Sequence, residues 1–185
     1  MNRRKPFIPQ RMPIFVGCEG QSERGYIAFL GRLAGSAVHL EAVVLQPGGG
    51  DPLSLVEKAI GKLEQKVRTR GIRYTARLIL LDADKRGLKP KRDARALQLA
   101  KDEGILLVWQ EPCHEALLLR HLDGRQNSRP PDTQTAIGQL KQQWRNYEKG
   151  MTVSQLEELL DLDAVRRASA VEPGLAKLLK VAGLI

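Results

Sequence analysis

Acidic side chains end a long apolar stretch of this sequence, where carboxylates could bind a metal ion and act on a phosphate group. An uninterrupted Leu-Ile-Leu-Leu run at 78–81 leads directly into Asp82 and Asp84. Such a run is typical of a strand buried on both faces, as in a parallel sheet. Because ligands bind outside the carboxyl ends of parallel strands, these two acids mark a candidate site. On their own they are equally compatible with a turn or a helix cap.

Two other apolar runs, at 14–18 and 105–110, also end in acids. The side chains that follow them are Glu19 and Glu23 after the first run, then Glu111, the weakest candidate, and Glu115 after the second. Parallel strands share one carboxyl edge, so residues far apart in the sequence meet there. We therefore expect Glu19, Glu23 and Glu115 to lie near the aspartate pair. For Glu23 and Glu115, stabilisation of a helix start is an equally compatible role.

Carboxylates crowded at one edge repel each other unless a positive charge sits among them. Oxygen ligands favour a hard cation, and the absence of His or Cys at ligand spacing argues against zinc. We therefore predict a Mg²⁺ or Mn²⁺ site, which would suit phosphoryl transfer. The predicted metal ligands are Glu19, Glu23, Asp82 and Asp84, and the predicted catalytic residues are Glu19, Asp82, Asp84 and Glu115.

Basic residues follow the aspartate pair at once. The chain has a formal net charge of +9 and a pI of about 9.8, which indicates a polyanionic partner, nucleic acid first. The positive charge is concentrated at 85–95, where Asp93 is the single acid. The predicted phosphate contacts in this segment are Lys85, Arg86, Lys89, Lys91 and Arg92. A solvated loop is an equally compatible interpretation.

The elements that would position these residues alternate regularly between strand and helix. Strands are expected at 14–18, 38–46, 76–84 and 105–110, and helices at 21–33, 52–70, 91–103 and 115–122. Ser22 and Asp51 are candidate helix caps, and the glycines at 48–50 indicate a loop, since they lack the ending of a phosphate-binding loop. The alternation predicts an α/β fold: a mainly parallel four-stranded sheet flanked by helices.

The ends of the chain differ from this pattern. Residues 1–13 read as a basic tail interrupted by prolines, 14–125 as the α/β domain, and 126–185 as a helical C-terminal extension packed on the same domain. Within the extension, helices are expected at 134–148, 153–161 and 174–182, with a break at Pro173-Gly174.

Composition excludes several classes of protein. A chain of 185 residues that is 42% hydrophobic suits one domain, and its 4% aromatic content implies an aliphatic core. No run approaches the roughly 20 apolar residues of a membrane span, and no signal peptide is expected. The two cysteines, Cys18 and Cys113, give no disulfide framework and are expected to be buried. A cytoplasmic location is the simplest expectation.

The sequence resembles the RloB-like family in two motifs. Residues 18–26, Cys-Glu-Gly-Gln-Ser-Glu-Arg-Gly-Tyr, are similar to its opening motif, and residues 112–121, Pro-Cys-His-Glu-Ala-Leu-Leu-Leu-Arg-His, to its second signature. The order of Glu19 before the aspartate pair also resembles the TOPRIM domain of topoisomerases, primases and OLD-family nucleases. The resemblance covers residues 14–122.

This resemblance implies a TOPRIM-like fold, a divalent metal and a role on nucleic acid in bacterial anti-phage defence, such as abortive infection, because RloB-like genes accompany restriction systems. By analogy with the OLD proteins, it implies a nuclease. The sequence departs from the family pattern at three positions, where Ser22 replaces Thr, Glu111 replaces Asn and His114 replaces an aromatic residue. The last two departures bear on the substrate pocket and the metal geometry.

Two functions are compatible with these observations. One is a metal-dependent nuclease that acts on DNA or RNA. The other is a non-catalytic TOPRIM-fold module that binds nucleic acid, a nucleotide or a partner protein. The sequence has no Walker A motif, so an ATPase or restriction-system partner would be separately encoded. The sequence leaves the oligomeric state open.

Overall fold

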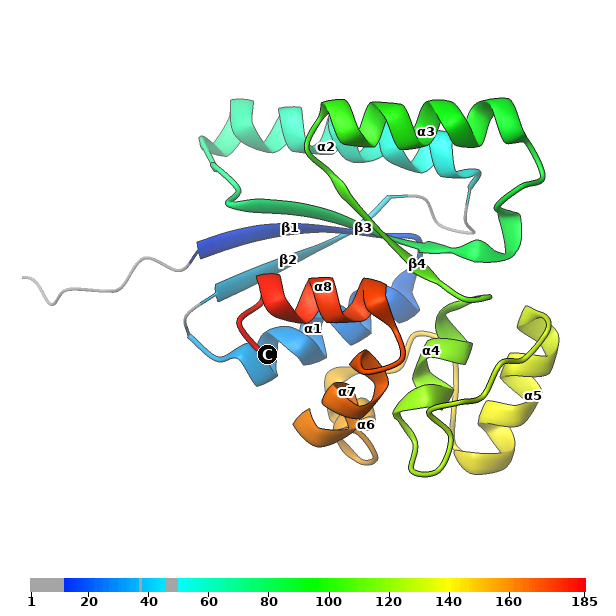
Figure 1. The fold of residues 1–185 in the computed structure, drawn as a ribbon. Coiled ribbons are helices and arrows are strands. Elements are labelled where there is room, and N and C mark those ends of the chain that lie inside the picture. Colours follow the sequence, from blue (N-terminus) through cyan, green and yellow to red (C-terminus); the bar gives the residue numbers. More distant parts are fainter. Residues whose placement is uncertain (1–11, 37, 46–49) are drawn as a thin grey trace, which may run out of the picture.

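The computed structural model describes residues 12–36, 38–45 and 50–185 and shows a four-stranded, entirely parallel sheet (Figure 1). The strands are β1 (Met12–Cys18), β2 (Val38–Val44), β3 (Ala76–Asp82) and β4 (Leu106–Gln110), in the order β2-β1-β3-β4. The predicted α/β fold is confirmed. The central strands are therefore β1 and β3, whose carboxyl ends carry Glu19 and Asp82.

Helices cover both faces of the sheet. On one face lie α2 (Pro52–Arg70) and α3 (Pro90–Asp102), and on the other lie α1 (Gln21–Ala34) and the C-terminal helices (Figure 1). Side chains of β3 alternate between the two layers. Leu78 and Leu80 pack with α1, whereas Ile79 and Leu81 pack with α2 and α3. Both sets are buried, which explains why this strand is apolar throughout.

The starts of the first two helices show one correct and one wrong cap prediction. Asp51 caps α2 by accepting a hydrogen bond from the Ser54 N–H at 3.4 Å. Ser22 does not cap α1, because Gly20 occupies the cap position. The Gly20 N–H donates to the Glu23 carboxylate at 2.9 Å. The Ser22 hydroxyl instead accepts a hydrogen bond from the Gly150 N–H at 3.0 Å.

Several predicted boundaries are corrected. Strand β1 includes Met12 and Pro13, which were assigned to the tail; residues 1–11 lie outside the described part of the chain, as do 46–49 in the glycine loop. Strand β2 ends at Val44. Strand β3 ends at Asp82, because Ala83 and Asp84 turn away and donate their N–H groups to the Pro112 carbonyl, in the short 3₁₀ turn η1 (Ala83–Lys85).

The C-terminal half also differs from expectation. Its helices are α4 (His114–His121), α5 (Thr133–Gln143), α6 (Val153–Glu157), α7 (Leu162–Ser169) and α8 (Pro173–Val181). Helix α5 ends at Gln143 and not at the predicted residue 148, because Trp144 and Tyr147 beyond it are buried in the core. Helix α7 was not predicted, although Asp161 caps it at 2.7 Å from the Ala164 N–H. Pro173 begins α8 instead of breaking the chain before it.

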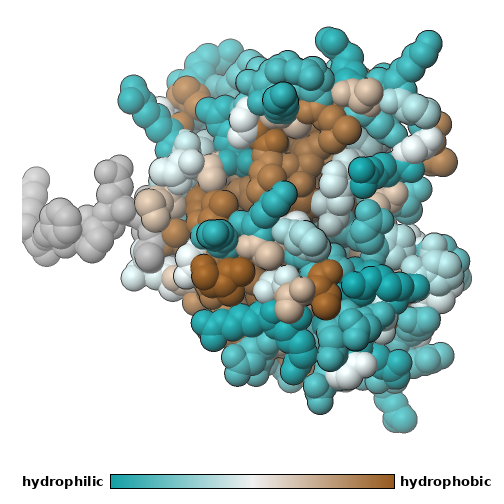
Figure 2. All heavy atoms as spheres, in the orientation of Figure 1, coloured by the Kyte–Doolittle hydropathy of each residue, from teal (hydrophilic) through white to brown (hydrophobic). Residues whose placement is uncertain are grey.

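The C-terminal helices share the core of the sheet. Leu175 and Leu178 of α8 belong to the same buried cluster as Leu78 and Leu80 of β3. The face drawn in Figure 2 has apolar side chains gathered over its centre, where Figure 1 shows β4 running between α3 and α8. Within the described residues, none of the helices combines the length and apolar character needed to cross a bilayer.

Candidate functional site

Five carboxylates line one cavity of about 390 Å³ at the carboxyl edge of the sheet. They come from the ends of β1 and β3 and from α1, η1 and α4: Glu19, Glu23, Asp82, Asp84 and Glu115. The structure thus brings together every acid that was predicted from the sequence to be a metal ligand or a catalytic residue. Glu111 is the exception among the strand-end acids, because its side chain is exposed and lies 3.7 Å from Arg86.

The cavity concentrates negative charge in a partly dry environment. Glu19, Glu23 and Glu115 are each less than 10% exposed. Burial, followed by repulsion from Glu23, Glu19, Glu115 and Asp84, raises the pKa of Asp82 to about 9. Removal from water and nearby like charges both oppose ionisation. In the absence of a cation, Asp82 is therefore predominantly protonated at neutral pH.

Backbone groups and one lysine hold the acids from β1 and β3. The His114 N–H donates to Asp82 Oδ1 at 2.9 Å, at the first turn of α4. Glu19 accepts from the Asp82 N–H at 3.4 Å and from Lys85 Nζ at 2.9 Å. Burial lowers the pKa of Lys85, but its bond to Glu19 and the surrounding carboxylates outweigh this and raise it. Lys85 is therefore a charged counter-ion within the site.

Glu115 is held by the C-terminal extension. Its Oε1 lies 3.2 Å from the Tyr147 hydroxyl, which donates to it, and 3.2 Å from Lys149 Nζ. Burial would raise the pKa of Glu115, but the charges of His114 and Lys149 outweigh burial and hold it below its ordinary value. Glu115 is therefore ionised at neutral pH, unlike Asp82.

The loop that carries Lys149 is fastened to α1. The Gly150 N–H donates to Ser22, and Gly150 has a positive φ of 81°, a conformation that favours glycine. A Cβ on Gly25 would lie 2.3 Å from the Met151 carbonyl oxygen, so only glycine allows this close approach. The position of the Lys149 backbone is thus set by its neighbours, although its side chain is 64% exposed.

A buried polar pair lies behind the cavity. His121 Nδ1 lies 2.8 Å from the Leu117 carbonyl, which can only accept, so Nδ1 carries the proton. The Tyr26 hydroxyl, 2.9 Å away, therefore donates to His121 Nε2. Burial lowers the pKa of His121 to about 4, so this residue is a neutral structural contact. Cys18 and Cys113 are buried as expected, and burial raises the pKa of both thiols.

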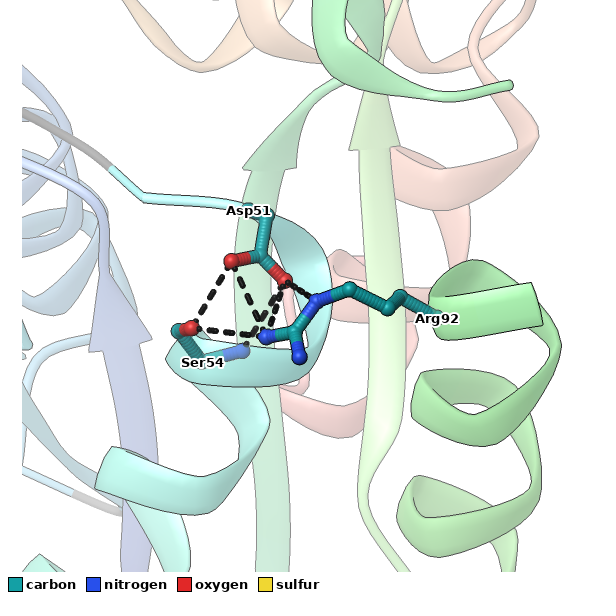
Figure 3. A network of polar contacts seen from close by, with 3 residues as sticks. All are labelled: Asp51, Ser54 and Arg92. Carbon is teal, nitrogen blue, oxygen red and sulfur yellow. Dashed lines mark hydrogen bonds and ion pairs between the residues drawn. The ribbon is translucent and has the colours of Figure 1, made fainter. Parts of the chain in front are cut away.

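The predicted phosphate contacts separate into distinct groups. Lys85 lines the acidic cavity, whereas Arg86 stacks over the Trp109 ring at 5.0 Å from its centroid. Arg92 binds Asp51 through two nitrogens, at 2.9 and 3.0 Å (Figure 3). Lys89 and Lys91 are exposed at the start of α3. Arg92 is therefore committed to a structural ion pair.

Three residues of the site were missed by sequence reasoning. They are Thr133, which donates to Asp84 Oδ2 at 3.3 Å, together with Tyr147 and Lys149. All three lie in the helical extension, outside the motifs that carried the family resemblance. The polar, turn-rich sequence around them gives no local signal of a site.

The acids of the cavity are suitable ligands for a hard divalent cation, because each offers carboxylate oxygen atoms. A cation would also offset the repulsion that opposes ionisation of Asp82. The present geometry is arranged around lysines and backbone N–H groups instead. In the described part of the chain, the structure has no group of three or more His, Cys, Asp or Glu side chains placed to hold one metal ion. Metal binding would therefore require side chains such as Glu19 to exchange partners.

Comparison with protein families identifies a match over most of the chain. A family model described as RloB-like protein matches residues 14–177. The matched region extends beyond the two motifs and includes the segment that supplies Thr133, Tyr147 and Lys149. Searches of curated proteins and of solved structures found no significant match.

Proposed function

The chain belongs to the RloB-like family, and from this premise we propose that it is a divalent-metal-dependent nuclease that acts on DNA or RNA. The observation that carries the proposal is the convergence of five carboxylates on one cavity that is lined by two lysines. A site with this excess of buried negative charge is poorly balanced by itself. A hard cation and a phosphate group would complete it.

The residues that would hold Mg²⁺ or Mn²⁺ are Glu19, Glu23, Asp82 and Asp84, which line the same cavity. The bound ion would neutralise these acids, polarise the scissile phosphate and activate water. The His114 N–H orients Asp82 Oδ1, and the Gly20 N–H holds Glu23. These backbone contacts fix two carboxylates from outside, which reduces the rearrangement that cation binding needs.

The two lysines are suited to bind the anionic substrate. Lys85 and Lys149 each contact a carboxylate at present, and both have a pKa raised by such contacts against the opposing effect of burial. They stay charged at neutral pH, and both would turn to phosphate oxygens when a cation binds Glu19 and the neighbouring acids. Ionised Glu115 can accept a proton from water or act as a ligand, but it cannot donate a proton.

The proposed setting is bacterial defence beside restriction systems, in the cytoplasm. It rests on the family resemblance, since RloB-like genes accompany such systems. A separately encoded ATPase or restriction subunit is the proposed protein partner. The relation to the OLD nucleases is part of the same proposal.

The direct test is incubation of purified protein with Mg²⁺ or Mn²⁺ and with single- and double-stranded DNA and RNA. Metal-dependent cleavage is expected for at least one substrate, and the double variant Asp82→Ala/Asp84→Ala should lose it by 100-fold or more, on the order of a lost catalytic group. The matched control is Glu64→Gln, an exposed acid on α2. Cleavage that survives in the double variant contradicts the assignment of the site.

One observation favours a second function. Lysines occupy Glu19 and Glu115, and the described residues contain no preformed group of metal ligands. This is what is expected of a non-catalytic module that binds nucleic acid, a nucleotide or a partner. That alternative predicts salt-sensitive binding of nucleic acid that is the same with and without divalent metal. The nuclease predicts tighter binding when the metal is present.

A further inference from the structure

A second cavity, of about 380 Å³, adjoins the acidic one along the carboxyl edge of the sheet. Its lining residues are Gly50, Asp51, Lys85, Leu88, Lys89 and Asp93. Lys85 lines both cavities, so its side chain stands at the boundary between them. A ligand that fills both would pass Lys85. The volume lies within the range of small-ligand pockets, roughly 300–1,000 Å³.

The walls of the second cavity are fixed to each other. Arg92 of α3 binds the Asp51 carboxylate at the start of α2, and Ser54 donates its hydroxyl to Asp51 Oδ2 at 2.8 Å (Figure 3). At the other wall, Asp93 accepts the Gly87 N–H at 2.7 Å. The starts of α2 and α3 are thus held together, and the cavity is largely formed before any ligand arrives.

The exposed charge at this cavity is that of Lys89. Asp51 is neutralised by Arg92, whereas Asp93 keeps its negative charge, with Oδ2 on the Gly87 N–H and Oδ1 buried without a hydrogen-bond partner among the described residues. Among the described residues, no hydrogen bond or ion pair engages the Lys89 ammonium group, which is exposed. Leu88 beside it is 72% exposed and offers an apolar surface. A ligand that carries an anionic group next to an apolar ring could place the anion on Lys89 and the ring on Leu88.

We propose that this cavity binds the nucleotide next to the scissile phosphate, with Lys89 on its phosphate and Leu88 against its sugar or base. The inference rests on the proposed nuclease function and adds to it a binding subsite beside the scissile phosphate. Lys85, between the cavities, contacts the strand where it passes from one to the other. A mononucleotide fills one cavity only and binds more weakly.

The first test is binding of a fluorescent twelve-nucleotide strand, DNA or RNA, to Lys89→Ala over a series of salt concentrations, with Ca²⁺ to limit turnover. Loss of one phosphate contact is expected to weaken binding about fivefold and to lower the salt slope by about one. The control is Lys101→Ala, an exposed lysine at the opposite end of α3, which should stay within twofold of wild type. Leu88→Ala should weaken binding without changing the slope.

A second measurement separates the two proposals. The small diester bis(p-nitrophenyl) phosphate needs only the acidic cavity, so its Mn²⁺-dependent hydrolysis reports the nuclease function alone. If wild type hydrolyses it and Lys89→Ala binds the twelve-nucleotide strand like Lys101→Ala, the second cavity is not a subsite. If neither this diester nor any polynucleotide is hydrolysed but Lys89→Ala weakens binding and lowers the slope, the second cavity binds a strand and the nuclease function fails.

Discussion

Two regions of this molecule bury charged side chains, and the buried charges are compensated differently in each. Arg120 of α4 is fully buried and pairs with Glu172 at the start of α8, at 2.7 Å. Its remaining nitrogens meet the Glu111 and Ser128 carbonyl oxygens. The acidic cavity instead gathers five carboxylates against two lysines. One region balances its charge within the fold, whereas the other leaves an excess.

The difference indicates what each region is for. The Arg120–Glu172 pair joins α4 to α8 and so connects the helical extension to the part of the chain that follows β4. It needs nothing from outside the protein. We propose that an external cation completes the acidic cavity, because groups that repel each other and are retained at one place usually mark a functional site. In this protein, whether buried charges are paired with opposite charges therefore separates a structural region from a candidate site better than the number of buried charges does.

The largest expected effect comes from breaking the balanced pair. Arg120→Met leaves Glu172 buried without its partner and should lower the free energy of unfolding by about 3–5 kcal/mol. Chemical denaturation measures it. Arg125→Met, at an exposed position, is the matched control and should change stability by less than about 0.5 kcal/mol. Equal stability of the two variants would mean that the pair does not join the helices.

A smaller effect of opposite sign is expected in the unbalanced region. Asp82→Asn keeps an oxygen for the His114 N–H but cannot ionise, so folding no longer requires this group to take up a proton. The variant should therefore stabilise the metal-free protein by about 1–3 kcal/mol at pH 8. The same variant should lose the stabilisation that Mn²⁺ gives to wild type. Asp123→Asn, whose side chain is 94% exposed, is the control. A destabilised Asp82→Asn would show that this acid supports the fold.

The pH dependence of this effect follows from the direction of the shift. The pKa of Asp82 rises on folding from 3.8 to about 9, so the folded state binds the proton more tightly. The stability from this group is fully present below about pH 4 and is lost as the pH rises toward 9. The advantage of Asp82→Asn over wild type should grow across this window and level off above it. An advantage that is constant with pH would contradict the raised pKa.

The smallest effect is expected at Lys149, whose side chain is largely solvated. Lys149→Met removes one counter-charge and should cost about 0.2–1 kcal/mol in the metal-free protein. It should also tighten Mn²⁺ binding, because a positive charge beside the acids is removed, while nuclease activity falls because a phosphate contact is lost. Lys141→Met, an exposed lysine on α5, should change none of the three. Weaker Mn²⁺ binding by Lys149→Met would mean that this lysine supports the site instead of competing with the metal.

The sheet and its acids could be predicted from the sequence because each depends on local pattern. A strand buried on both faces must be apolar throughout, so Leu78 to Leu81 identified the centre of the sheet. The parallel topology then placed Glu19 and Asp82 on neighbouring strands. Position along the chain and strand direction were enough to bring these acids together.

The rest of the site depends on tertiary packing. Lys149 reaches Glu115 because Gly25 allows the loop to approach α1 and Ser22 fastens it. Nothing in the sequence near Lys149 indicates this contact. Ser22 itself suggested a helix cap, since the type of residue suits both roles. Arg92 suggested a phosphate contact, but its charge is used within the fold.

The proposal that a divalent cation completes the acidic cavity can be checked in a crystal structure. Crystals would be grown with Mn²⁺ and a short oligonucleotide and measured for the anomalous signal of manganese. The expected result is a manganese peak bound by Asp82 and at least one of Glu19 and Asp84, with Lys85 moved away from Glu19. A nucleotide-bound structure without a manganese peak in the cavity, and with both lysine–carboxylate pairs intact, would contradict it.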